Sequence, residues 1–247
     1  MDGNIVGYAL HYSGILIEAA LILYVARSSH GNRPLSVLPY LSCLLAADLA
    51  RAYTLREYGL TSRQYSYIYW STDFLLVISA FFLVCLFFRR ACLHQEKMWR
   101  FVRLLLAFIC LLVVGISGLL FSHNYGNLLT GFIVEFNQNL YFTCLVLNTL
   151  LYLLLQQIDS ADDQLGLLVC GVGIQFAGPA ATLALFHLMT GEGFAQSLAH
   201  FTIPLCTIGM LLVWAYAVVH VKDTATQVTR RQIPVLAEVT AHFNIQV

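Results

Sequence analysis

Three long stretches without a charged residue constrain this chain more than any other feature. Residues 104–134, 164–191 and 193–221 contain no Asp, Glu, Lys or Arg. The hydrocarbon core of a bilayer is about 30 Å thick and is crossed by ~20 helical residues, so each stretch is long enough to cross it. The apolar runs are continuous rather than alternating, which favours helices over a β-barrel. The sequence therefore predicts a helical membrane protein.

Charge content supports this prediction and excludes one class of partner. Only 11% of the residues are charged, whereas a soluble domain carries about 25%. Lys and Arg together number 13, as do Asp and Glu, so the chain offers no basic surface for nucleic acid. We expect the lipid bilayer to be its main partner.

The fold class that follows is all-α, a polytopic transmembrane bundle of about seven helices. The run 104–134 is divided by a predicted turn at 122–127, which is rich in polar residues and glycine. The first apolar segment follows Asp2 without a preceding Lys or Arg, so we expect it to stay as a helix rather than act as a signal peptide. Residues 1–221 form the predicted transmembrane domain and 222–247 a cytoplasmic tail. The predicted spans are about 5–26, 35–54, 66–88, 102–121, 128–155, 166–190 and 199–221.

Basic residues predict the orientation. If the N-terminus lies outside, only three of the 13 basic residues lie on the outer side, namely Arg51, Arg56 and Arg63. The other ten fall on the cytoplasmic side, five of them within the single segment 89–103. Cytoplasmic loops carry an excess of Lys and Arg, so the bias predicts an N-outside, C-inside protein.

The sequence contains no motif for a known catalytic or metal chemistry. HExxH, GxSxG and P-loop patterns are absent. The seven cysteines include no CxxC pair, which argues against a disulfide framework. We therefore expect a non-enzymatic protein without a metal or cofactor, and we predict no catalytic residues.

Polar residues at membrane depth are the candidate functional residues. Ionisable side chains inside spans cost roughly 2.5–3.5 kcal/mol each at mid-helix and usually face the bundle interior. Most of them fall in the outer half of the predicted bundle, and only Glu18 reaches the middle. The pattern predicts a polar pocket open to the outside that binds a small extracytoplasmic ligand. The residues expected to line it are His11, Asp48, Trp70, Asp73, Glu135 and Asn139.

Other interpretations of these polar residues stay open. Asp48 and Arg51 are three residues apart and can pair on one helix face, as a structural pair. The whole set can equally serve as interhelical hydrogen bonds that hold the bundle together. The functional alternatives are a sensor or small-ligand-binding module, a small transporter or proton-coupled channel, and a haem-binding or redox enzyme.

The sixth predicted span also carries small residues at helical spacing. Such residues let helix backbones approach closely, so this stripe predicts tight helix packing. Its members are Gly166, Cys170, Gly173, Ala177 and Ala181.

The entry to the third predicted span is distinctive. Tyr65, Tyr67, Tyr69 and Trp70 are followed by Asp73, a Y-x-Y-x-Y-W pattern with an acid three positions on. This stretch resembles a family of uncharacterised multi-helix membrane proteins common in acidobacteria. The sequences Phe87-Phe88-Arg89 and Leu165-Gly166-Leu167 also fit that family.

The resemblance implies a stand-alone seven-helix bundle in the bacterial inner (plasma) membrane, and it implies no particular activity. A weaker likeness is to the membrane sensor regions of bacterial histidine kinases. The present sequence lacks their catalytic domains, so the likeness does not extend to phosphotransfer.

Overall fold

The computed structural model describes residues 2–27, 35–59, 62–92, 96–123, 128–157, 162–188 and 202–220. Over these residues the chain is entirely helical, with seven α-helices and one short 3-10 helix. The helices are α1 (Asp2–Arg27), η1 (Leu35–Val37), α2 (Leu38–Tyr58), α3 (Arg63–Ala91), α4 (Glu96–His123), α5 (Leu128–Gln157) and α6 (Asp163–Leu188), followed by helix 202–220 (Thr202–His220).

The all-α prediction is confirmed, and each predicted span coincides with a helix. The largest displacement of a boundary is six residues, at the beginning of α4. Five of the helices are long and apolar enough to cross a membrane, and they are α3, α4, α5, α6 and helix 202–220. Membrane crossing by α1 and α2 stays a prediction, and the predicted tail 222–247 lies outside the described residues.

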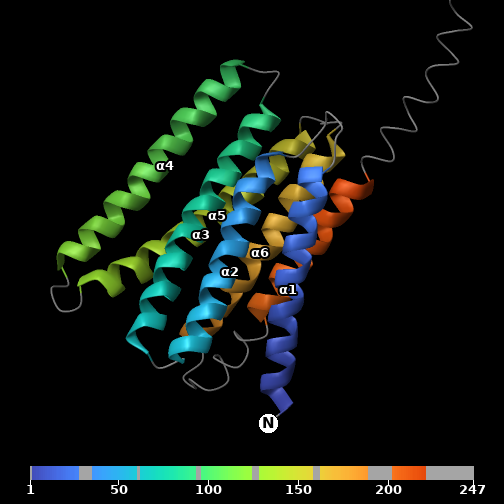
Figure 1. Cartoon of the computed structure of the whole chain (residues 1–247). Helices are drawn as coiled ribbons and strands as arrows, with labels where there is room; N and C mark the ends of the chain where they lie inside the picture. Colours follow the sequence, from blue (N-terminus) through green and yellow to red (C-terminus); the bar gives the residue numbers. More distant parts are fainter. Residues whose placement is uncertain are drawn as a thin grey trace, which may run out of the picture.

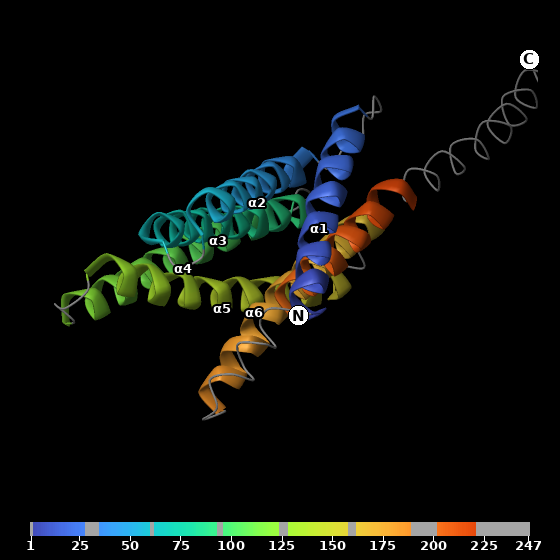
Figure 2. The ribbon, with the colours of Figure 1, turned by 60° about the horizontal axis from the view of Figure 1, so that its bottom comes forward.

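The helices run alternately up and down the bundle (Figure 1). The N-terminal ends of α1 and α3 and the C-terminal end of α2 lie at one end of the molecule. Helix α3 packs against α2, α4, α5 and α6, while α1 packs against α2. Figures 1 and 2 both show α1 lying across helix 202–220.

A tight connection between α2 and α3 fixes the register of these two helices. Gly59 ends α2 with a φ of 74°, a left-handed conformation that glycine adopts without steric cost. The Ser62 side chain then caps α3 by accepting a hydrogen bond from the backbone amide of Tyr65, at 3.1 Å. The short connection leaves α2 and α3 antiparallel and packed against each other.

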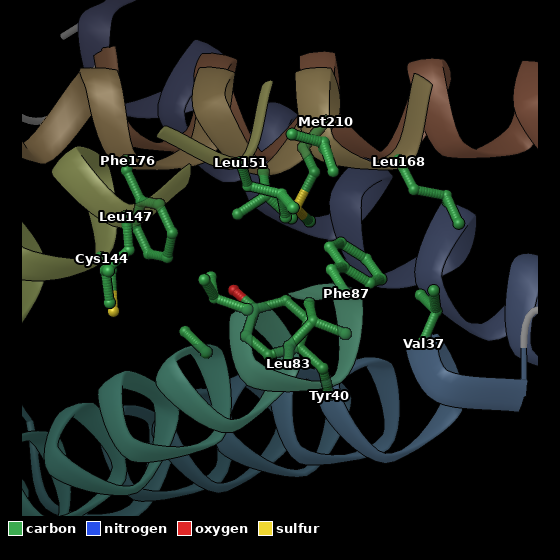
Figure 3. Close-up of a cluster of buried hydrophobic side chains, with 14 of the residues drawn as sticks. Val37, Tyr40, Leu83, Phe87, Cys144, Leu147, Leu151, Leu168, Phe176 and Met210 are labelled. Atoms are coloured by element: carbon green, nitrogen blue, oxygen red, sulfur yellow. The ribbon is translucent and has the colours of Figure 1, made fainter. Parts of the chain in front are cut away.

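The centre of the bundle is a cluster of buried apolar side chains, to which α1 to α6 and helix 202–220 all contribute (Figure 3). Trp214 of helix 202–220 is fully buried and packs edge-on against Tyr40 of α2, with ring centroids 5.9 Å apart. Its indole nitrogen donates a hydrogen bond to the backbone oxygen of Leu168 on α6, at 2.9 Å. This residue therefore ties helix 202–220 to two others.

Close packing of α6 uses glycines on a different face from the predicted stripe. A Cβ added to Gly171 would lie 2.6 Å from the Trp214 ring, and one added to Gly178 would lie 2.8 Å from Cys206 Sγ. Both glycines face helix 202–220, whereas Gly173 of the stripe faces Asn148 on α5. The stripe prediction is otherwise wrong, because Cys170, Ala177 and Ala181 are exposed and Gly166 meets nothing within 4 Å.

Helix α4 lies at the edge of the bundle (Figure 1). Its inward residues Val102, Leu106 and Val113 are buried, but most of its other large apolar side chains are exposed. Phe101, Leu104 and Leu111 are each about two-thirds or more exposed. In a membrane this face meets lipid, which has the same apolar character.

Candidate functional site

A polar network joins α2, α3 and α5 around Asp73, the acid singled out from the sequence. The Arg51 guanidinium of α2 lies 3.4 Å from the carboxylate of Asp73 on α3. Arg51 Nε also donates to the Thr72 hydroxyl at 2.8 Å, and the guanidinium carbon lies 4.6 Å from the centre of the Tyr69 ring. Both charged side chains are mostly buried, with 18% and 19% of their area exposed.

Helix α5 supplies two further donors to the same carboxylate. Asn137 Nδ2 donates to Asp73 Oδ2 at 2.7 Å, and the Tyr141 hydroxyl donates to Oδ1 at 3.5 Å. Hydrogen bonds to an ionised acceptor are the stronger ones, and the Asn137 contact has the short length expected for them. Both oxygens of Asp73 are therefore engaged by side chains of the bundle itself.

The predicted pairing of Arg51 needs correction. The sequence suggested an Asp48–Arg51 pair within α2, but the ion pair observed for Arg51 joins it to Asp73 on the neighbouring helix. The physical reason is that α2 and α3 are in contact, so the long arginine side chain reaches Thr72 and Asp73 across the interface. Arg51 thus links two helices instead of stabilising one.

The other predicted pocket residues lie in several places. Trp70 lies beside Tyr69 on α3 and packs edge-on against its ring, with ring centroids 5.5 Å apart. Asn139 is half-buried on α5. The side chains of His11 and Glu135 lie outside the described part of the chain, although their backbone belongs to α1 and α5. Only Asp73, among the predicted pocket residues, is shown within the network.

The buried polar face of α5 differs from the one that the sequence suggested. Asn137, Tyr141, Cys144 and Asn148 follow one another at helical spacing, and Asn137 and Asn148 are only 3% and 4% exposed. The sequence prediction placed Glu135 and Asn139 in the pocket instead. The sequence does contain a signal for the observed face. The four residues are separated by four, three and four positions, a spacing that places them on one face of a helix.

Glu18 of α1 is the most unusual polar residue in the described chain. Its side chain is completely buried, and neither carboxylate oxygen has a hydrogen-bond partner among the described residues. It occupies the inward face of α1 together with Gly14, Leu21 and Val25. Tyr40 and Asp48 of α2 lie within electrostatic range of it. The predicted pocket residue Asp48 therefore belongs to the surroundings of Glu18.

The remaining buried polar atoms without partners in the described chain are also oxygens. They are the amide oxygens of Asn137 and Asn148 on α5 and of Gln175 on α6. Asn148 uses its nitrogen to donate to the backbone oxygen of Val169, at 3.0 Å. Because each of these atoms is an acceptor, the interior lacks donors rather than acceptors.

A second interhelical connection, which sequence reasoning missed, lies at the opposite end of α3. Arg90 donates to both oxygens of Asp162, at 2.9 and 3.1 Å, and to the side-chain oxygen of Gln164, at 3.0 Å. Asp162 also accepts from the backbone amide of Leu165 and so caps α6. Residues 90 and 162 are far apart in sequence, so no local pattern indicates the pair.

Comparison with known proteins identifies no relative: no family model, no curated protein and no solved structure matches the chain. No group of three or more His, Cys, Asp or Glu side chains within the described ranges is arranged to hold a metal ion.

Proposed function

We propose that this protein is a non-enzymatic membrane sensor or small-ligand-binding module, and that its ligand binds inside the helix bundle at Glu18. The observation that carries the proposal is the complete burial of a carboxyl group with no partner among the described residues. Moving a carboxylate from water into a medium of low polarity costs of order 20 kcal/mol in the ideal case and still several kcal/mol in real proteins. Such a group needs a proton, a cation or a hydrogen-bond donor.

In this proposal the Asp73 network is a structural support rather than the ligand site. Its carboxylate already accepts from Arg51, Asn137 and Tyr141, so a ligand has to displace one of these donors. Polar contacts of this kind between membrane helices are common and stabilise a bundle modestly. The network thus positions α2, and with it Tyr40 and Asp48, beside Glu18.

The proposal is tested by measuring thermal unfolding of the purified protein across a broad screen of small ligands and pH values. Glu18→Gln keeps the size of the side chain and removes its charge, and Glu57→Gln is the matched control at an exposed position of the same bundle. The expected result is a ligand- or pH-dependent stabilisation that Glu18→Gln abolishes and Glu57→Gln retains. Retention of the shift by Glu18→Gln would refute the assignment.

The same proposal includes the orientation and location of the protein. The N-outside, C-inside arrangement is supported by the basic residues, and the resemblance of residues 65–73 to acidobacterial proteins supports a bacterial inner membrane. On this view the end of the bundle that holds the N-termini of α1 and α3 is the outer one. A fluorescent protein fused after residue 247 should fluoresce if the C-terminus is cytoplasmic, and an exported C-terminus would leave it dark.

Proton-coupled transport is a second candidate because unpartnered oxygens continue along the bundle. Asn148 lies 11 residues beyond Asn137 on α5, which is about 16 Å along the helix axis. Together with Glu18 and Gln175 these atoms form acceptors at several depths. Proton flux in proteoliposomes under an imposed pH gradient tests this candidate, and a trace equal to that of empty vesicles would exclude it.

A further inference from the structure

The chemistry around Glu18 restricts the class of ligand that the site can take. The described titratable side chains within electrostatic range of it are Tyr40 and Asp48 from α2, and Tyr40 in turn lies within range of Cys43 from α2 and Cys144 from α5. Each of these groups is neutral when protonated and negative when deprotonated, so none supplies positive charge. The described part of helix 202–220 adds ionisable groups only at Cys206 and at the exposed Tyr216 and His220. No lysine, arginine or histidine is among the buried residues of the described chain.

The basic side chain that lies closest in sequence to Asp48 on α2 is already engaged. Arg51 lies three residues from Asp48 on α2, but its guanidinium contacts Asp73, Thr72 and the Tyr69 ring on α3. It therefore does not neutralise Glu18. The interior polar atoms without partners add no donor either, because they are oxygens of Asn137, Asn148 and Gln175. A buried carboxylate without a basic neighbour among the described residues attracts positive charge.

We propose that Glu18 holds a small monovalent cation inside the bundle, with the Tyr40 hydroxyl and the Asp48 carboxyl beside it. This inference rests on the proposed function, since it names the ligand class for the same site. A small cation restores the charge balance at Glu18 without a bulky binding cavity. The shared chemistry covers a proton, an alkali metal ion and a primary ammonium group, and the experiment distinguishes these three sources.

The experiment is thermal unfolding of the full chain in lipid nanodiscs at constant ionic strength, with choline as the large-cation reference. One arm replaces choline by sodium or potassium, a second replaces it by methylammonium, and a third varies pH in choline alone. The expected result is saturable stabilisation of the protein by the metal ion, by methylammonium or by protons. A ligand that binds only the folded state raises the stability of the protein once the ligand concentration exceeds Kd. Stabilisation by metal ion or ammonium should weaken at low pH, where protons compete for the carboxylate.

Three variants decide the outcome. Glu18→Gln should remove the stabilisation, Glu57→Gln should behave like the parent, and Tyr40→Phe should weaken binding about threefold to tenfold through loss of one hydroxyl contact. Tyr40→Phe keeps the ring that packs on Trp214, so it provides a readout if Glu18→Gln does not fold. Saturable stabilisation of the parent that neither Glu18→Gln nor Tyr40→Phe alters would overturn the inference.

The design separates failure of this inference from failure of the proposed function. In one outcome, none of the three cations stabilises the parent protein, but a neutral ligand does, and Glu18→Gln abolishes this stabilisation. This outcome contradicts cation binding and supports a ligand site at Glu18. A parent protein that responds to no ligand and no pH change contradicts both.

Discussion

The Asp73 network allows a quantitative test, because one carboxylate accepts two hydrogen bonds of different length from the same helix. Asn137 donates at 2.7 Å and Tyr141 at 3.5 Å. Hydrogen bonds between membrane helices contribute about 0.6 kcal/mol on average and at most about 1.7 kcal/mol. We assign the Asn137 bond to the upper part of this range, about 1–1.5 kcal/mol, and the Tyr141 bond to less than about 0.5 kcal/mol, since interactions near 3.5 Å are weak.

Double-mutant cycles measure these two coupling free energies directly. The cycles combine Asp73→Ala with Asn137→Ala in one case and with Tyr141→Phe in the other. The single change Asp73→Ala should cost about 2–4 kcal/mol, because it leaves the Arg51 guanidinium without its carboxylate in a site that is still one-fifth open. Glu57→Gln serves as the exposed control.

Reversible unfolding in mixed detergent micelles provides the free energies. The account requires a larger coupling for Asn137 than for Tyr141. Equal couplings, or a coupling to Asn137 that is indistinguishable from zero, would show that the network does not hold α3 to α5 as described.

Two further predictions concern helix packing and the Arg90–Asp162 pair between α3 and α6. Gly171→Ala should lower the free energy of unfolding by about 1–3 kcal/mol, since the new methyl group would lie 2.6 Å from the Trp214 ring, and Gly166→Ala should be nearly neutral. Asp162→Ala should cost more than Arg90→Ala in the same assay, because it removes both the ion pair and the cap of α6, and the ion pair alone contributes only up to ~1 kcal/mol at a partly exposed site. The glycine prediction fails if both alanine variants are equally stable, and the cap prediction fails if Arg90→Ala is the more damaging change.

The sequence predicted the helices well because membrane insertion depends on a property that is local. Long charge-free runs and their polar boundaries indicate where a helix begins and ends, so the predicted spans agree with the observed helices to within six residues. Asp73 was also predicted as a key residue, since an acid at membrane depth is costly wherever it points.

The pairing of polar residues could not be predicted in the same way. Arg51 was assigned to Asp48 because both lie on α2, whereas its partner lies on α3. The choice depends on how two helices are rotated about their axes, and apolar sequences specify that rotation weakly. The Arg90–Asp162 pair illustrates the same point, since it joins the end of α3 to the start of α6.

The importance of Glu18 became clear only from its burial. In the sequence it was one of several acids, distinguished by its depth alone. The structure separates it from Asp73, because Asp73 has donors from two helices and Glu18 has none among the described residues. The proposed binding site therefore narrows from a pocket predicted between α1, α2, α3 and α5 to Glu18 on the inward face of α1.

Infrared difference spectroscopy of the protein in nanodiscs tests this central claim most directly. Addition of a stabilising metal or ammonium ion should convert a protonated carboxyl band into a carboxylate band in the parent protein, and if the cation is a proton, lowering the pH should produce the reverse change. Glu18→Gln should lack the change while Asp73→Asn retains it. A difference spectrum that survives in Glu18→Gln and disappears in Asp73→Asn would contradict this assignment and place the site at the Asp73 network instead.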